Sequence, residues 1–148
     1  MSLDPNKTYH LVDTHSGKGL SYEVYASYDY VREVEGVGTG LKFELVDGEG
    51  IYNSYKIKMT GSHWDNYTYL TKSGKEWIYL DTKDNATTWT IQRDGEGDLT
   101  LIWQKGHEST ASFRYYESGS KRWLGTGKNN EYEDIHCPVK RFNIVAAD

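Results

Sequence analysis

A spacing of 46 residues constrains this chain more than any other feature of its sequence. An aromatic residue followed two positions later by an aliphatic one occurs at 43/45, 89/91 and 142/144. The first two pairs are 46 residues apart (89 − 43), and the third follows after 53 (142 − 89). Alternation with period 2 predicts strands, and the Asp-Gly pairs that follow the first two predict tight turns. The pattern therefore indicates a threefold internal repeat.

Other stretches share this offset. The sets of equivalent positions are Tyr9-x-Leu11, Tyr55-x-Ile57 and Leu101-x-Trp103; Glu23-Val24, Tyr69-Leu70 and Tyr115-Tyr116; and Val31-Arg32, Trp77-Ile78 and Trp123-Leu124. Trp123 is still in register, whereas Phe142 arrives 7 residues late (53 − 46). We therefore expect an insertion in the third copy, between Gly125 and Val139.

Each copy offers about four short strands separated by turn residues, and one copy alone cannot bury its apolar face. Three four-stranded units in 148 residues predict an all-β, β-trefoil fold, with a six-stranded barrel capped by three hairpins. We expect one domain over residues 1–148, with copies at about 7–50, 51–97 and 98–148. A lipocalin-like or fatty-acid-binding barrel is the main alternative, but neither predicts a 46-residue period.

The repeat also predicts which apolar side chains form the shared core. The expected core residues are Leu11, Val24, Phe43, Leu45, Ile57, Leu70, Ile78, Trp89, Ile91, Leu101, Trp103, Leu124, Phe142 and Ile144. Trp89 and Phe142 are accordingly interpreted as structural rather than ligand-binding residues.

Composition narrows the classes of partner. The net charge of −5 argues against nucleic acid, because phosphate binding needs a basic stripe. No apolar stretch approaches the length of a membrane span, which predicts no membrane insertion. Residues 1–6 are polar and lack the apolar core of a signal peptide, so we expect a cytoplasmic protein. A single cysteine, Cys137, excludes an intrachain disulfide.

The sequence contains no strong enzyme motif, neither a phosphate-binding Gly-rich loop nor a nucleophile elbow nor a His-Glu-x-x-His pair. Its five histidines are scattered, and His15 and His107 occupy equivalent positions in different copies. The acidic pairs Asp47/Glu49 and Asp94/Glu96 lie in predicted tight turns rather than facing one cleft. We therefore expect neither catalysis nor a metal or other cofactor.

Aromatic residues with amide and carboxylate neighbours in predicted loops favour carbohydrate binding. Sugar rings present an apolar face that packs on Trp or Tyr, while their hydroxyls bind Asp, Asn and Gln. Two clusters have this composition. The candidate residues are Trp64, Asp65, Asn66, Trp77 and Tyr79 in the second copy, and Trp123, Asn129, Asn130 and Tyr132 in the third. The competing interpretation is that the rings cap the barrel and the polar residues form turns.

Basic residues in predicted loops indicate a second candidate function, the inhibition of a protease. Lys128, at the tip of Gly127-Lys128-Asn129, could enter the acidic specificity pocket of a trypsin-like protease from a rigid, extended loop. Arg32 is the second candidate for such an inhibitory loop. The competing interpretation is that both side chains are simply solvated.

The opening Leu3-Asp4-Pro5-x-x-Thr8-Tyr9-x-Leu11-Val12, followed by Ser16-Gly17-x-Gly19-Leu20, resembles small fungal β-trefoil proteins. These include ricin-B-like mushroom lectins, the lectin-like light subunit of mushroom tyrosinase, and mushroom protease inhibitors. Ricin-B-type lectins carry Gln-x-Trp in the closing strand of each copy. Here Leu41, Thr87 and Lys140 replace that glutamine, so the standard galactose sites are not carried over.

The resemblance implies a non-enzymatic protein of fungal defence, with three classes of partner. These are glycans or glycoproteins, a serine or cysteine protease, and a protein bound by a lectin-like subunit. A lone sugar site would be weak, so useful avidity would need several sites or a homodimer.

Overall fold

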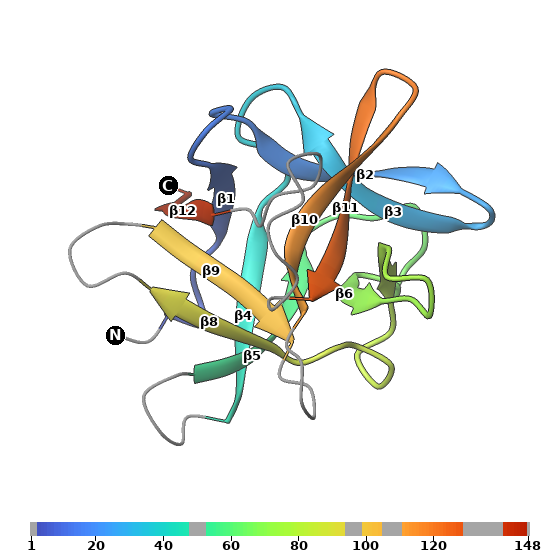
Figure 1. Cartoon of the computed structure of the whole chain (residues 1–148). Coiled ribbons are helices and arrows are strands. Elements are labelled where there is room, and N and C mark those ends of the chain that lie inside the picture. The colour runs from blue at the N-terminus through green and yellow to red at the C-terminus, as the bar shows by residue number, and fades with distance from the viewer. Residues whose placement is uncertain (1–2, 48–52, 94–98, 105–110, 129–140, 148) are drawn as a thin grey trace.

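The computed structural model describes residues 3–47, 53–93, 99–104, 111–128 and 141–147, and every regular element in them is a strand (Figure 1). The twelve strands are β1 (Tyr9–Asp13), β2 (Gly19–Tyr25), β3 (Tyr28–Val34), β4 (Leu41–Asp47), β5 (Asn53–Met59), β6 (Tyr69–Lys72), β7 (Ile78–Asp81), β8 (Trp89–Arg93), β9 (Leu99–Gln104), β10 (Ala111–Ser118), β11 (Lys121–Lys128) and β12 (Arg141–Ala146). They form three groups of four. None of the described elements is a helix that could cross a membrane.

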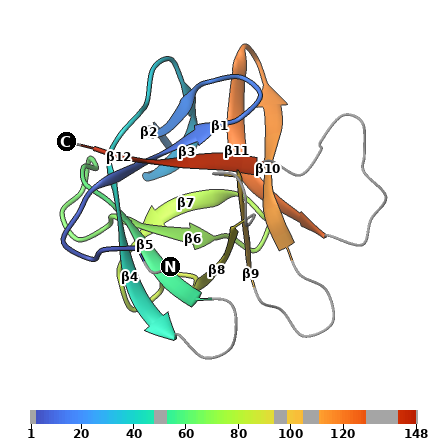
Figure 2. The ribbon, with the colours of Figure 1, turned by 90° about the vertical axis from the view of Figure 1, so that its left-hand side faces the viewer.

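Six of these strands close a barrel. Going round the ring, β1 pairs with β4, β4 with β5, β5 with β8, β8 with β9, β9 with β12, and β12 with β1, all antiparallel. Figure 2 shows β12 running beside β1, which joins the last strand to the first. Because the ring closes, each of these six strands pairs with a neighbour on both of its edges.

The other six strands form three hairpins, β2–β3, β6–β7 and β10–β11. Each hairpin touches the other two. Tyr30 of β3 pairs with Tyr79 of β7, and Arg32 of β3 pairs with Trp123 of β11. A bridge between Trp77 and Gly125 joins the remaining two hairpins. This arrangement is the predicted β-trefoil, three four-stranded repeats with pseudo-threefold symmetry.

The core lies inside the barrel and under the hairpins, and most of the repeat-derived residues belong to it. Leu11, Phe43, Ile57, Leu70, Ile78, Trp89, Ile91, Leu124 and Phe142 are buried as expected, and Ile144 packs against them. The Trp89 indole N–H donates to the carbonyl oxygen of Leu70 at 3.1 Å, so this large buried side chain leaves no polar atom unpaired.

Two core predictions are wrong, since Val24 and Leu45 are exposed. Val24 lies near the tip of the β2–β3 hairpin, which projects beyond the barrel. Leu45 lies where the pairing of β4 with β5 shifts register, at the end of β4. The repeat predicted which face each side chain points to, but not how far each strand extends past the core. The side chains of Leu101 and Trp103 lie outside the described part of the structure, and Ile102 between them is buried.

Candidate functional site

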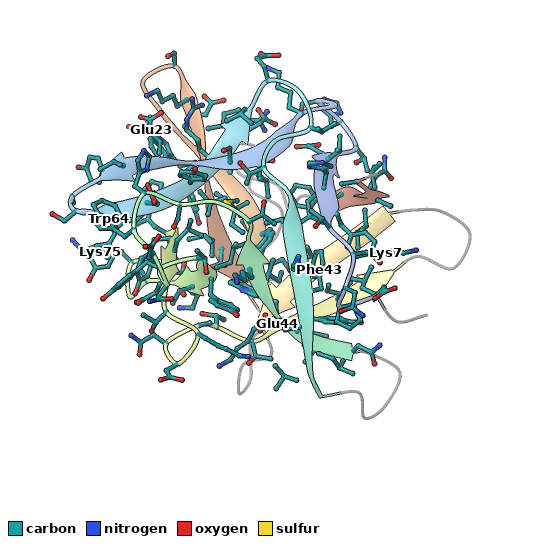
Figure 3. The ribbon with its side chains drawn as sticks, turned by 180° about the vertical axis from the view of Figure 1, so that it is seen from behind. Lys7, Glu23, Phe43, Glu44, Trp64 and Lys75 are labelled. Carbon is teal, nitrogen blue, oxygen red and sulfur yellow. The ribbon has the colours of Figure 1, made fainter. Side chains whose placement is uncertain are left out.

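A group of exposed and half-buried aromatic side chains covers one side of the hairpin cap, and we call it the aromatic face. Its members are Tyr25, Tyr28 and Tyr30 from the β2–β3 hairpin, Tyr79 from β7, and Trp64 and Tyr67 from the 60–68 connection between β5 and β6. Tyr25 is 66% exposed and Trp64 is 40% exposed. Figure 3 shows Trp64 at the edge of the molecule, beside the tip of the β2–β3 hairpin.

The rings of the aromatic face contact one another, edge to face in two of the four contacts and tilted in the other two. Tyr28 lies 5.2 Å from Tyr79 and 6.4 Å from Tyr67, measured between ring centroids. Tyr30 likewise contacts Tyr79 at 5.8 Å and Tyr25 at 5.9 Å. Edge-to-face packing holds the rings in place while leaving parts of their faces open to solvent.

Local sequence explains why the tyrosines emerge together. In β3 the alternation of a strand places Tyr28 and Tyr30 on one side, while Asp29 and Val31 are buried on the other. The hairpin tip, Ala26 and Ser27, has positive φ at both residues, 51° and 71°. A two-residue turn of this kind matches the twist of the strands it joins, although neither residue is the usual glycine or asparagine.

Polar contacts fix the rest of the aromatic face. The Tyr79 hydroxyl donates to the buried carboxylate of Asp81. Partial burial of Tyr79 is the larger cause, and this hydrogen bond the second, of a pKa above the ordinary tyrosine value. In the 60–68 connection, the Trp64 carbonyl oxygen accepts from the Ser62 hydroxyl at 2.6 Å and from the Tyr67 amide at 3.2 Å. These bonds close the turn that presents Trp64.

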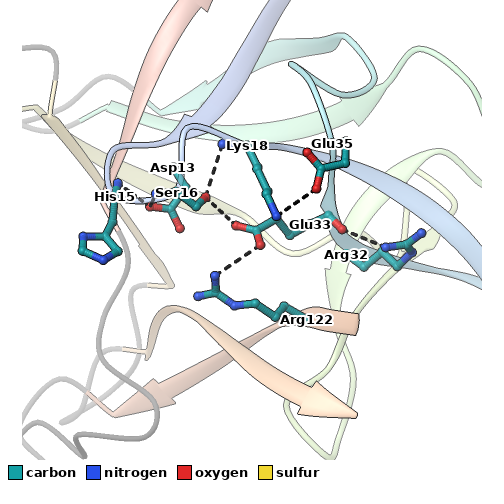
Figure 4. Close-up of polar contacts among 8 residues, drawn as sticks. All are labelled: Asp13, His15, Ser16, Lys18, Arg32, Glu33, Glu35 and Arg122. Carbon is teal, nitrogen blue, oxygen red and sulfur yellow. Dashed lines mark hydrogen bonds and ion pairs between the residues drawn. The ribbon is translucent and has the colours of Figure 1, made fainter. Parts of the chain in front are cut away.

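A second cluster lies between the β2–β3 and β10–β11 hairpins, and we call it the ionic seam. Figure 4 shows the part of it around Glu33, with Ser16, Arg32 and Arg122. Its members are Ser16, Glu23, Arg32, Glu33, Lys121 and Arg122. The buried Glu33 carboxylate accepts from the Ser16 hydroxyl at 2.7 Å and from the Arg122 guanidinium at 3.2 Å. Arg122 also lies over the ring of Tyr115, 4.5 Å from its centroid. These contacts tie the first and third copies together.

Glu23 accepts from both neighbouring cations in the ionic seam. Its carboxylate bonds to the Lys121 ammonium and to the Arg32 guanidinium, the latter at 2.9 Å. The hydrogen bond from Lys121, and then the nearby charges of Lys121 and Arg32, hold the pKa of Glu23 below its ordinary value. In the described residues, no three His, Cys, Asp or Glu side chains gather closely enough to hold a metal ion.

The placement of Arg32 corrects a sequence prediction. Arg32 is not in a loop but inside β3, paired with Ser21 on one side and Trp123 on the other. Its guanidinium also donates to the Glu33 carbonyl oxygen at 2.9 Å. A side chain held in this way in the middle of a sheet cannot enter a protease pocket as an exposed loop residue would.

The predicted second-copy sugar cluster divides in two. Trp64 and Tyr79 join the aromatic face, with Asp65 and Asn66 exposed beside Trp64. Trp77 instead packs on Tyr116 of β10, with 5.4 Å between ring centroids. Gly125 makes this contact possible, because a Cβ atom there would lie 2.4 Å from the Tyr116 ring. Trp77 is therefore part of the junction between hairpins.

The predicted third-copy cluster is described only in part. Trp123 is half-buried within β11, opposite Tyr116 of β10. Asn129, Asn130, Tyr132, His107 and Cys137 lie outside the described residues, and so does the Lys128 side chain, although Lys128 itself ends β11.

Sequence reasoning missed most of the aromatic face. Four tyrosines fall within the nine residues from 22 to 30, a density that marks an exposed hairpin face rather than a core strand. The repeat aligns Glu23-Val24 in this stretch with Tyr69-Leu70 and Tyr115-Tyr116, and the absence of an aromatic residue at 23 and 24 is the departure that could have revealed the aromatic face.

Comparison with solved structures supports the fold. The chain is similar to trypsin inhibitor 1 from Senna obtusifolia, with a TM-score of 0.76, 10% identity, and coverage of 99% of this chain and 93% of the inhibitor. It is also similar to soybean trypsin inhibitor in complex with porcine pancreatic trypsin, with a TM-score of 0.73, 12% identity and coverage of 99% and 94%.

The lysenin pore gives a TM-score of 0.71 at 12% identity, but this chain spans only 48% of that one. The sequence matched no protein-family model and no curated protein. At these identities the likeness concerns the fold, and it supports the β-trefoil part of the resemblance drawn from the sequence. The similar structures named here are inhibitors and a pore-forming protein rather than enzymes.

Proposed function

We propose that this protein is a non-enzymatic binding protein that inhibits a protease through an exposed loop. Two of the solved structures that resemble it over nearly the whole of both chains are trypsin inhibitors, and one of them was solved bound to trypsin. Because the identities are 10% and 12%, the loop has to be located from this chain itself.

Lys128 is the residue on which the proposal rests. β11 ends at Lys128 and β12 begins at Arg141, so their connection contains 12 residues (129–140). The equivalent connections contain 6 residues (35–40) and 7 residues (82–88). Lys128 is the last residue of β11, paired with Ala111, and not the loop-tip residue that the sequence predicted. It borders the longest of these three connections and carries the positive charge that a trypsin-like specificity pocket binds.

Inhibition of trypsin, chymotrypsin and papain by the purified protein tests the proposal. We expect trypsin inhibition that Lys128→Ala abolishes. Lys75, an exposed lysine in the β6–β7 turn, provides the matched control, and Lys75→Ala should leave the inhibition constant unchanged. An unchanged constant for Lys128→Ala would exclude this loop, and no inhibition of any of the three proteases would exclude the function.

Carbohydrate binding is the second candidate function, and the aromatic face favours it. Trp64 and Tyr67 expose ring surface beside the polar side chains of Asp65 and Asn66. This combination suits a sugar, which needs apolar contact and hydrogen bonds together. A glycan array tests it. No glycan binding on the array and no inhibition in the protease assays would favour the third possibility, a lectin-like subunit that binds another protein.

A further inference from the structure

The connection that carries Trp64 is tied to the sheet by one buried carboxylate. Asp29 of β3 is 1% exposed and accepts two hydrogen bonds from His63. Its Oδ2 atom accepts from the His63 backbone amide at 2.7 Å, and its Oδ1 atom lies 2.6 Å from Nδ1 of the imidazole. Both oxygens of Asp29 are thus directed at a single residue of a loop 34 positions away in the sequence.

This pair fixes the orientation of the His63 imidazole. Because a carboxylate only accepts hydrogen bonds, Nδ1 must carry the proton that lies between the two side chains. When the ring is neutral, Nε2 is therefore the acceptor. The His63 side chain is 54% exposed, and no described residue forms a hydrogen bond with Nε2.

Aromatic rings flank the imidazole on two sides. The Tyr22 ring meets it edge to face, with 5.3 Å between centroids. The exposed Trp64 ring lies 6.1 Å from the His63 ring, measured between centroids. A directional polar atom thus sits next to an open apolar surface, and the sheet holds the polar atom in place.

We infer that His63 and Trp64 form a saccharide-binding subsite, in which the sugar ring packs on Trp64 and one of its hydroxyls donates to Nε2 of His63. Asp29 is a positioning residue, since it acts only through the imidazole. This inference rests on the carbohydrate-binding candidate above and names the residues that would carry it.

The chemistry of the subsite favours a sugar over a protein surface. Binding sites for small polar ligands combine apolar walls with a few polar groups whose positions are fixed in advance. Here the fixed group is the exposed Nε2 atom of one imidazole beside one indole ring, which matches a hydroxyl-bearing ring with one apolar face. An anionic ligand would instead meet the exposed carboxylate of Asp65, next to Trp64.

A printed array of mono- and oligosaccharides, probed with the full-length protein, identifies the ligand. The strongest hit is then titrated against three variants. We expect Trp64→Ala and His63→Ala each to weaken binding by about tenfold or more. Leu45→Ala removes an exposed apolar side chain on β4, outside the aromatic face, so this variant should bind as the unmodified protein does.

Two results would overturn the subsite while leaving carbohydrate binding intact. One is unchanged affinity in Trp64→Ala and His63→Ala, and the other is an equal loss in Leu45→Ala. If the protein binds no glycan on the array, carbohydrate binding itself is overturned, and the subsite with it.

Nitrogen NMR of the imidazole tests the role of Asp29. In the unmodified protein we expect the Nδ1–H tautomer of His63, and the array hit should shift the Nε2 resonance. Asp29→Asn should reduce the population of that tautomer and weaken binding, with thermal unfolding recorded to show that the variant is folded. If the hit leaves the His63 resonances of the unmodified protein unmoved, the subsite is wrong regardless of how the variants fold.

Discussion

The β2–β3 hairpin meets its two neighbours through different chemistry. Toward β10–β11 it presents Glu23 and Glu33, whose carboxylates bond to Lys121 and Arg122 across the ionic seam. Toward β6–β7 it presents Tyr28 and Tyr30, which pack on Tyr79 in the aromatic face. One hairpin of a threefold fold thus has two junctions that are equivalent by symmetry but unlike in composition.

This difference shows which junction is available for binding. In the ionic seam the charged groups are already paired with one another, so a ligand would have to break these contacts before forming its own. In the aromatic face the rings pack by their edges and keep exposed surface. We therefore interpret the ionic seam as a structural clamp and the aromatic face as the surface for a partner.

The largest expected effect comes from removing the buried centre of the clamp. Glu33→Ala leaves Arg122 and the Ser16 hydroxyl without their acceptor, and we expect it to lower the free energy of unfolding by about 2–3 kcal/mol. Urea denaturation measures the loss. Glu35→Ala is the matched control, since the Glu35 side chain is 88% exposed against 5% for Glu33, and it should show no measurable change.

Equal stability of these two variants would contradict the clamp. The comparison also predicts that Glu33→Ala, where folded, binds any ligand of the aromatic face with unchanged affinity. A loss of affinity there would mean that the two junctions are coupled.

Within the aromatic face, stability depends on one hydrogen bond more than on the exposed rings. Tyr79→Phe removes the donor to the Asp81 carboxylate but keeps the ring, and we expect a loss of about 1 kcal/mol in urea denaturation. Tyr25→Ala removes a whole ring that is mostly exposed, and we expect it to change stability less than Tyr79→Phe does. The reverse order would mean that the exposed ring contributes to folding, which would weaken its assignment to a binding surface.

The repeat made the barrel predictable, but it could not predict these junctions. The spacing of Phe43, Trp89 and Phe142 determines which side chains fill a shared core, because all three copies must meet there. The hairpin junctions lie outside that core, where each copy faces a different neighbour. Arg32 was therefore predicted in a loop although its partners, Glu23 and Trp123, come from two different strands. Contacts of this kind depend on register, which a single sequence does not reveal.

We expect high pH to lower the free energy of unfolding, because the folded structure raises the pKa of two tyrosines, Tyr30 and Tyr69. Burial, and then the neighbouring phenols of Tyr25 and Tyr28, raise the pKa of Tyr30. Burial and a hydrogen bond to Glu44 raise the pKa of Tyr69, in β6, to about 12. A raised pKa means that the folded state favours the protonated phenol. Its contribution is therefore complete below about pH 10 and is lost as the pH rises toward about 12.

Urea denaturation between pH 8 and pH 11 measures this alkaline loss. Tyr69→Phe cannot ionise at that position, so its stability should fall less steeply over this range. Parallel curves for Tyr69→Phe and the unmodified protein would show that Tyr69 titrates as it does in the unfolded chain.

Low pH should instead weaken the ionic seam. The expected loss of stability is smaller than in the three preceding predictions. The lowered pKa of Glu23 means that the folded state favours the ionised carboxylate. The contribution of Glu23 to stability is therefore complete above its ordinary pKa of 4.5, and it is lost as the pH falls through the lower pKa of the folded state. We expect Glu23→Gln to cost about 0.2–1 kcal/mol at pH 7 and low salt, and less in 1 M NaCl, because both partners are partly exposed.

The matched control for Glu23→Gln is Glu117→Gln, an exposed carboxylate on β10 that forms no ion pair with the described residues. Acid denaturation of the two variants separates a paired carboxylate from an unpaired one. If Glu23→Gln becomes less sensitive to acid while Glu117→Gln does not, the two junctions respond to opposite ends of the pH scale.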